Sequence, residues 1–245
     1  MNITGISLWG DSIGKGVMYD AQRGRYAIYG DNLFSMLKKS LDIPVDNYAV
    51  MGCTAPVGEE RMKRAELREG SLAVIEFGGN DCDMPWADIS AAPEGEYLPK
   101  TPLDKFCDSV RGMIYRAREQ GATPVLVTPP PLDAGRYFNW VSRKLNADNI
   151  LDYLGDVQYI YRWQEHYASA VRRIASETSC ALCDIRDQFL ALRRIDRLLC
   201  VDGIHPNQQG YSIISNYATK RLNEVYDVVI EYRSASGPSG KRPSF

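Results

Sequence analysis

Five short apolar runs, separated by longer segments, constrain the fold of this chain more than any other feature. The runs have the length of buried strands and cover Gly5 to Trp9, Val45 to Ala49, Leu72 to Phe77, Pro124 to Thr128 and Ala181 to Ile185. Parallel neighbours in a sheet need a crossover segment between them, and each interval here is long enough to supply one. The alternation predicts a mostly parallel five-stranded sheet with helices on both faces, a three-layer α/β/α sandwich.

The intervals between these runs carry helical patterns. The clearest one has apolar residues every three or four positions, as one buried helix face requires: Leu103, Phe106, Cys107, Val110, Met113, Ile114 and Ala117. A second strong stripe, from Ile213 to Val229, marks the last helix. Weaker patterns predict helices over about 26–41, 59–68 and 161–177, so every interval contains one. In such a sheet the loops after the first four strands should converge at one edge.

The length of the chain predicts a single domain. A chain of 245 residues can bury one α/β core, and we expect that domain over residues 1–233. Residues 129–163 are rich in aromatic side chains and are expected to form an insertion. Residues 234–245, SASGPSGKRPSF, lack periodicity and are rich in Ser, Gly and Pro, so we expect a disordered tail.

The charge balance argues against a nucleic-acid partner. Lys and Arg number 29 against 31 Asp and Glu, with no long run of one sign, whereas nucleic-acid binders usually carry a basic patch. The start of the chain resembles no signal peptide, and no stretch approaches the length of a membrane span. These features predict a cytoplasmic protein with a small-molecule substrate, and they leave its oligomeric state open.

Six cysteines raise the question of disulfides or a metal site. A core of this size needs no disulfides, so we expect reduced, mostly buried thiols. Cys180 and Cys183 have a C-x-x-C spacing, but they lie in an expected strand, where residues three apart point to opposite faces. No second pair exists, and we therefore expect no metal site.

The first apolar run ends abruptly in GDSIGKG, residues 10–16. A phosphate-binding P-loop needs Ser or Thr after its lysine, but Lys15 is followed by Gly16. A dinucleotide fingerprint needs Gly or Ala at position 19, which is Tyr19. The third interpretation is a sharp turn that presents Ser12 as a nucleophile at the edge of the sheet.

A serine nucleophile needs a base and a group that orients the base, and the chain has only two histidines. His166 lies in a helical segment without a suitably placed carboxylate, so we expect a structural or surface role. His205 follows Asp202 by three residues, and one turn of loop can bring that carboxylate to the imidazole. An ordinary helix-capping loop would explain Pro206 and Asn207, but neither Asp202 nor His205.

Four segments together resemble the four blocks of the SGNH hydrolases, also called the GDSL lipase/esterase family. They are Gly10-Asp11-Ser12, Gly52, Gly78-Gly79-Asn80-Asp81 and Asp202-Gly203-Ile204-His205-Pro206. Each block is weak alone, but the four occur in family order from residue 10 to residue 206. The resemblance covers nearly the whole domain and implies the flavodoxin-like SGNH hydrolase fold.

The resemblance also implies a role for each matching residue. Ser12 is expected to be the nucleophile, His205 the base and Asp202 the residue that orients the base. The oxyanion hole is expected to comprise the backbone N–H groups of Ser12 and Gly52 and the side-chain amide of Asn80.

Some positions in these blocks have other interpretations. Ile13 and Gly14 stand where the family often has a leucine and a hydroxyl residue. Asp11 and Asp81 follow the family pattern, and we interpret them as carboxylates that brace their loops.

The function implied by the resemblance is a serine esterase that hydrolyses a carboxylic ester through an acyl-enzyme on Ser12, with neither a metal nor a cofactor. The acyl group would be carried by a carbohydrate, a lipid or a small alcohol. Two alternatives stay open: an acyltransferase with the same site, and a non-catalytic binding module that holds an anion in the glycine loop.

Aromatic residues in segments 82–101 and 129–163 are candidates for the wall of a substrate site, because both segments follow strands whose carboxyl ends face it. Trp86, Tyr137 and Trp140 are the candidate substrate-binding residues. The same rings can equally pack an inserted helical hairpin onto the domain.

Overall fold

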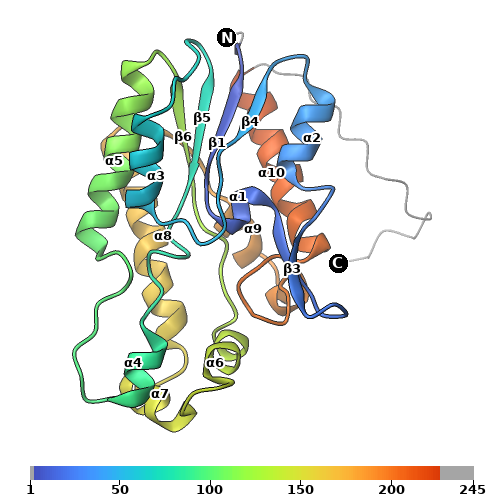
Figure 1. The fold of residues 1–245 in the computed structure, drawn as a ribbon. Helices are drawn as coiled ribbons and strands as arrows, with labels where there is room; N and C mark the ends of the chain where they lie inside the picture. Colours follow the sequence, from blue (N-terminus) through green and yellow to red (C-terminus); the bar gives the residue numbers. More distant parts are fainter. Residues whose placement is uncertain (1–2, 227–245) are drawn as a thin grey trace.

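A five-stranded parallel sheet forms the middle layer of the structure, a computed structural model that describes residues 3–226 (Figure 1). Its strands are β1 (Ile6–Gly10), β4 (Val45–Asn47), β5 (Leu72–Glu76), β6 (Thr123–Val127) and β7 (Ala181–Cys183), in the order β4-β1-β5-β6-β7. Each lies within two residues of a strand predicted from the sequence. The three-layer α/β/α architecture is confirmed.

The order of the strands reverses between β1 and β5. Both strands start the alignment at the same level, with Ile6 opposite Leu72, and end it with Gly10 opposite Glu76. The crossover from β1 leads to β4 on one side, and the crossover from β4 returns to β5 on the other. A crevice therefore opens beyond the carboxyl ends of β1 and β5, the place where open α/β sheets bind ligands.

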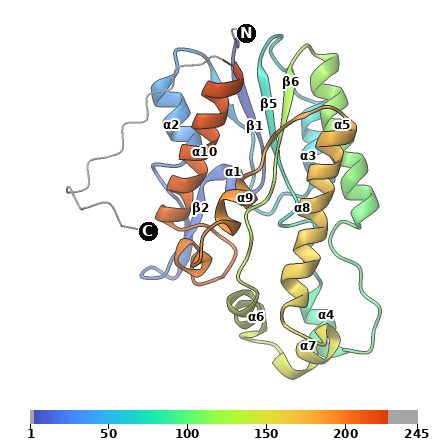
Figure 2. The same cartoon turned by 180° about the vertical axis from the view of Figure 1, so that it is seen from behind.

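Helices cover both faces of the sheet (Figures 1 and 2). One face carries α3 (Ala55–Lys63), α5 (Leu103–Glu119) and α8 (Tyr159–Glu177). The other carries α2 (Leu33–Ser40), α9 (Ile185–Leu190) and α10 (Gln208–Tyr226). None of the helices within residues 3–226 is both long and apolar enough to cross a membrane.

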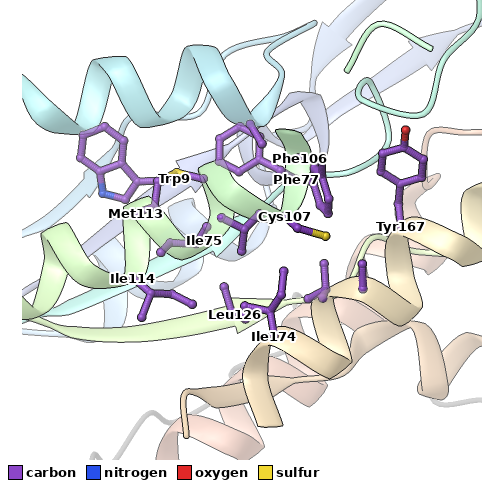
Figure 3. Close-up of a cluster of buried hydrophobic side chains, with 14 of the residues drawn as sticks. Trp9, Ile75, Phe77, Phe106, Cys107, Met113, Ile114, Leu126, Tyr167 and Ile174 are labelled. Carbon is purple, nitrogen blue, oxygen red and sulfur yellow. The ribbon is translucent and has the colours of Figure 1, made fainter. Parts of the chain in front are cut away.

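The larger core cluster lies under α3, α5 and α8 (Figure 3). Trp9, Ile75 and Leu126 point from three strands toward Met113 and Ile114 of α5. The apolar stripe expected for α5 is the face that it buries. A second cluster on the opposite face joins strand residues to α2, α9 and α10.

All six cysteines are buried, as expected, and none forms a disulfide. Cys180 belongs to the cluster under α5 and α8, whereas Cys183 belongs to the cluster on the other face. The prediction that this C-x-x-C pair points to opposite faces of the sheet is confirmed.

The helix predicted over residues 26–41 is wrong in its first part. A hairpin of β2 (Val17–Asp20) and β3 (Arg25–Ile28) stands there, and Tyr19 pairs directly with Tyr26 across it. The helix α2 begins only at Leu33, where Asn32 caps it by accepting a hydrogen bond from the Ser35 backbone N–H. The paired rings lie 5.2 Å apart and stabilise the hairpin.

The helix predicted over residues 59–68 is displaced, because α3 already begins at Ala55. Pro56 lies in its first turn, where the missing N–H of proline costs nothing. The last helix ends its described part at Tyr226, so the end of its predicted stripe at Val229 lies outside the described residues. The same holds for the predicted tail, residues 234–245.

The segment 129–163 contains α6 (Ala134–Ser142), α7 (Ala147–Leu154) and the first turn of α8. These helices pack with α4 (Trp86–Ala91) beyond the carboxyl ends of the strands (Figure 1). Ile89, Ile150 and Ile160 are buried in this group, which has an apolar cluster of its own. The helices of this segment therefore form a packed unit, and some of its aromatic side chains also line the cavity described below.

The packing of α5 predicts a contrast between two neighbouring residues. Ile114 is fully buried, so Ile114→Ala should lower the free energy of unfolding by about 2 to 5 kcal/mol. Tyr115 is 53% exposed, and Tyr115→Ala should change it by only about 0.5 kcal/mol. Urea denaturation followed by circular dichroism measures both; equal losses would contradict this assignment of faces.

Candidate active site

Ser12 stands directly after β1, at the crevice between β1 and β5. It is the first residue of the short helix α1 (Ser12–Lys15), and Asp11 caps that helix by accepting a hydrogen bond from the Ile13 N–H at 2.8 Å. The N–H of a residue at the start of a helix has no carbonyl partner within the helix. The chain thus presents both the hydroxyl and the backbone N–H of Ser12 at the crevice, and Ser12 lines its cavity.

His205 connects Ser12 to Asp202. Its Nε2 lies 2.9 Å from Ser12 Oγ, and its Nδ1 lies 2.6 Å from Asp202 Oδ2. The other carboxylate oxygen of Asp202 accepts the backbone N–H groups of Ile204 and His205, both at 3.2 Å. The three residues predicted from the sequence as a triad therefore form one continuous line of hydrogen bonds.

Opposing effects act on the buried Asp202 carboxyl. Burial raises its pKa, but the hydrogen bond and charge of His205 and the two backbone donors together outweigh burial. The pKa of Asp202 is thus lower than usual, and the group is a carboxylate at neutral pH. A carboxylate at Nδ1 requires the proton on that nitrogen, which leaves Nε2 free to accept a proton from Ser12.

The turn after β4 carries Gly52 to the same cavity. Gly52 has a φ of +79°, a conformation that side chains disfavour, within a turn closed by the Cys53 N–H and the Val50 carbonyl at 3.0 Å. The Val50 N–H donates to the Gly10 carbonyl at 3.0 Å and ties this turn to the end of β1. This contact explains how a glycine forty residues along the chain lies beside Ser12 in the cavity lining.

Asn80 follows β5 and completes the expected set of donors. Its Nδ2 donates to Asp11 Oδ2 at 2.9 Å, which uses one of its two hydrogens. The structure brings Ser12, Gly52 and Asn80 to one cavity wall. These are the three positions expected to contribute the oxyanion hole.

Asp81 holds the loop after β5 in place. Its two carboxylate oxygens accept the N–H groups of Ala55 at 2.8 Å and Gly78 at 3.1 Å. Burial is the main reason that its pKa rises to about 6. Asp81 does not line the cavity and contacts the backbone, as its interpretation as a bracing carboxylate requires.

The cavity has a volume of about 210 Å³ and is mostly apolar. Beyond the residues already described, its wall comprises chiefly large apolar and aromatic side chains: Met51, Met84, Trp86, Leu132, Tyr137, Leu154, Tyr159, Ile160, Trp163 and Ile204. In the described part of the chain, no Lys or Arg side chain lines it.

Trp86 and Tyr137, two of the predicted substrate-binding residues, are held in this wall by Asp83. Trp86 Nε1 and the Tyr137 hydroxyl donate to the same Asp83 oxygen, at 2.7 and 2.6 Å. Lys100 donates to the other oxygen at 2.7 Å. Burial and the charge of Asp83 raise the pKa of Tyr137 well above its usual value, so its hydroxyl remains a donor.

Trp140, the third of these predicted residues, does not line the cavity. Its ring packs against Tyr19 of the β2–β3 hairpin at 4.7 Å and against the Arg143 guanidinium at 3.3 Å. The Trp140 ring also lies 6.4 Å from the ring of Tyr26, so it packs behind a residue that lines the cavity.

Tyr26 lines the cavity and was not anticipated as a site residue. Its ring lies 5.0 Å from the His205 ring, and burial together with Asp202 raises its pKa. The one local signal for it is Gly24, a turn-forming residue between two short segments that each contain a tyrosine and a β-branched residue, as hairpin strands often do. His166, by contrast, is exposed and faces Trp163 at 5.6 Å, away from the triad.

A metal centre finds no support in the described part of the chain. Among residues 3–226, no group of three His, Cys, Asp or Glu side chains is arranged to hold an ion.

Several solved structures share this fold. A lipase/acylhydrolase from Enterococcus faecalis has a TM-score of 0.62 and 18% identity, with 95% of this chain and 100% of that chain covered. The acetyl xylan esterase AlAXEase has a TM-score of 0.57 and 18% identity, covering 89% of this chain and 98% of its own. The esterase EstA from Pseudoalteromonas sp., inhibited by monoethylphosphonate, has a TM-score of 0.57 and 15% identity, covering 92% and 100%.

Sequence comparisons give one further finding. No curated protein matches the chain. The model of the GDSL-like lipase/acylhydrolase family matches residues 8–213, a span that includes all the residues expected in the site. The chain therefore belongs to the GDSL-like lipase/acylhydrolase family.

Proposed function

We propose that this carboxylic ester hydrolase acts through an acyl-enzyme on Ser12. The observation that carries the proposal is the line of hydrogen bonds from Ser12 Oγ through His205 to Asp202, at 2.9 and 2.6 Å. A serine hydroxyl alone is a weak nucleophile, and a neutral imidazole in hydrogen-bond contact is the base that activates it.

In the first half of the reaction, Ser12 Oγ attacks the ester carbonyl carbon while His205 Nε2 takes the hydroxyl proton. Asp202 stabilises the resulting imidazolium. The carbonyl oxygen becomes negatively charged and accepts hydrogen bonds from the N–H groups of Ser12 and Gly52 and from the Asn80 amide. When the tetrahedral intermediate collapses, the ester C–O bond breaks, and His205 returns its proton to the leaving alcohol.

In the second half, water replaces the serine as the nucleophile. His205 takes a proton from the water while the water oxygen attacks the acyl carbon. Collapse of the second intermediate breaks the bond to Ser12 Oγ, and His205 returns the proton to Ser12. The products are the carboxylic acid and the free enzyme.

The lining of the cavity favours an apolar acyl group. Burial of methylene groups against its aromatic and aliphatic wall stabilises a bound ester, whereas no cation in the wall can pair with an anionic substrate. Within residues 3–226, the ionisable cavity groups besides His205 and Tyr side chains are Asp11, Glu76, Cys82 and Asp83. We therefore propose an uncharged ester whose acyl group occupies this wall, with a small alcohol or a lipid as its other half.

The triad predicts the effect of single substitutions. Ser12→Ala and His205→Ala should each lower kcat/KM by roughly 10⁴- to 10⁶-fold, because each removes the nucleophile or its base. His166→Ala is the matched control and should retain normal kcat/KM. Hydrolysis of a p-nitrophenyl ester measures the rates, and a phosphonate label mapped by mass spectrometry should be found on Ser12. A comparable loss in His166→Ala, or a label elsewhere, would contradict the assignment.

The proposed oxyanion hole predicts that loss of one of its donors lowers kcat but not the binding of substrate. Asn80→Ala removes one donor to the developing oxyanion and should lower kcat by roughly 10² to 10³ with little change in KM. Asn139→Ala is the control, because Asn139 lies exposed on α6. Normal turnover in a folded Asn80→Ala enzyme would rule out this role.

The apolar wall predicts a dependence on acyl length. Each added methylene that the wall buries is worth about 0.8 kcal/mol, so kcat/KM should rise roughly fourfold per methylene until the cavity is filled. Trp163→Ala should flatten this rise while leaving the acetyl ester nearly unaffected. A series of p-nitrophenyl esters from acetyl upward tests it, and a maximum at acetyl would contradict the proposal.

Product analysis separates hydrolysis from acyl transfer. With the same esters, the free acid should be the main product whether or not sugars or alcohols are added. An acylated acceptor as the main product would replace hydrolysis with acyl transfer at the same serine.

A further inference from the structure

Glu76 ends β5 beside the nucleophile and has no part in the reaction described above. Its side chain is buried, and neither carboxyl oxygen has a hydrogen-bond partner among residues 3–226. The backbone N–H groups of Asp11 and Gly14 lie near the carboxyl but do not reach hydrogen-bond geometry. A buried carboxylate in this position would lack the donors that an anion requires.

A second buried carboxyl, that of Asp11, lies within hydrogen-bond reach of the Glu76 side chain. The parallel register places Gly10 opposite Glu76, so Asp11 follows directly at the same level. Two adjacent buried carboxyls cannot both be ionised, because like charges at short range disfavour the charged forms. One of them must carry a proton.

The hydrogen bonds decide which carboxyl is ionised. Asp11 Oδ1 accepts from the Ile13 N–H at 2.8 Å, and Asp11 Oδ2 accepts from Asn80 Nδ2 at 2.9 Å. Two donors favour the anion at Asp11, whereas Glu76 has none. The proton therefore belongs to Glu76, and the Asp11 carboxylate is an acceptor within its reach.

We propose that Glu76 is a positioning residue: as a neutral carboxylic acid it donates a hydrogen bond to Asp11, which in turn holds the Asn80 amide in the oxyanion hole. This inference rests on the proposed function, because it assigns Asn80 a task in the reaction. With one Nδ2 hydrogen fixed on Asp11, the other is directed by the planar amide rather than by free rotation.

Burial and the charge of Asp11 both raise the pKa of Glu76 well above its usual value. Burial also raises the pKa of Asp11, against the opposing effect of its donors and of His205. Tyr211, on α10, also faces the pair, and Asp81 faces Asp11. These groups are unchanged in the variants below, so differences between variants report on Glu76 itself.

The proton on Glu76 has a signature in stability that does not depend on activity. Glu76→Gln keeps a donor toward Asp11 and cannot ionise. The folded wild type retains a proton that the unfolded chain releases above the ordinary glutamate pKa of 4.5, so folding becomes less favourable as the pH rises. The Tm of Glu76→Gln relative to wild type should therefore increase as the pH rises above the ordinary glutamate pKa.

Glu60→Gln is the control for this measurement. Glu60 is exposed and pairs with Lys63 at 2.9 Å, which lowers the pKa of Glu60. The Tm of Glu60→Gln relative to wild type should therefore not increase as the pH rises. A Tm difference between Glu76→Gln and wild type that stays constant with pH would overturn the proposal, because Glu76 would then be ionised in the folded protein.

The positioning role is tested by turnover. Glu76→Met has a similar volume but no donor, and it should lower kcat by roughly 10- to 100-fold with KM nearly unchanged, because Asn80 loses its fixed orientation. Glu76→Gln should keep kcat within about threefold of wild type, since it donates as the acid does.

A double variant distinguishes positioning from a general structural effect. In an Asn80→Ala background, Glu76→Met should cost little further turnover, because the group that it positions is absent. A kcat loss in the double variant equal to the product of the two single losses would overturn the positioning role. Low kcat in a well-folded Glu76→Gln enzyme would overturn it as well. A wild type without esterase activity would instead overturn the proposed function, and the Tm comparison would still decide where the proton resides.

Discussion

The site depends on the parallel alignment of β1 with β5 at the point where the strand order reverses. Because Gly10 and Glu76 end their strands side by side, the chain leaves both strands at one level. Asp11 and Ser12 then lie beside the loop that carries Asn80, which Asp81 holds in place. The hydrogen bond from Val50 to Gly10 adds the turn of Gly52 to the same level. His205 and Asp202 arrive from a loop far along the chain and contact a site whose other half is already fixed.

Much of this arrangement was predictable because strand–helix alternation follows from local patterns of apolar residues. All five strands of the sheet, and the helices α5 and α8, lie close to their predicted positions. The site residues were predictable for another reason. A serine and an asparagine just after strand ends, together with an aspartate three residues before a histidine, have few structural roles that explain them together. The family match supports that combination, and the geometry brings the same residues into contact.

The features missed by the sequence analysis are those decided by tertiary contacts. The β2–β3 hairpin has an apolar pattern that also fits a helix, and its pairing of Tyr19 with Tyr26 becomes apparent only when both strands are placed. Glu76 looks like an ordinary residue at the end of a strand. Its unusual character arises from burial beside Asp11, which no spacing in the sequence reveals. Trp140 is a candidate for the cavity wall because its segment follows a strand that ends at the site, but its ring packs on the hairpin instead.

The group of helices α4, α6 and α7 has an apolar cluster separate from the two that cover the sheet. Two residues of this group that line the cavity, Trp86 and Tyr137, are held by hydrogen bonds to Asp83. Ser12, His205 and Asp202 are held instead by the end of β1 and by the loop of Asp202. Under the proposed function, substitutions in this group of helices can therefore change the wall around the acyl group while the hydrogen bonds of Ser12, His205 and Asp202 stay in place.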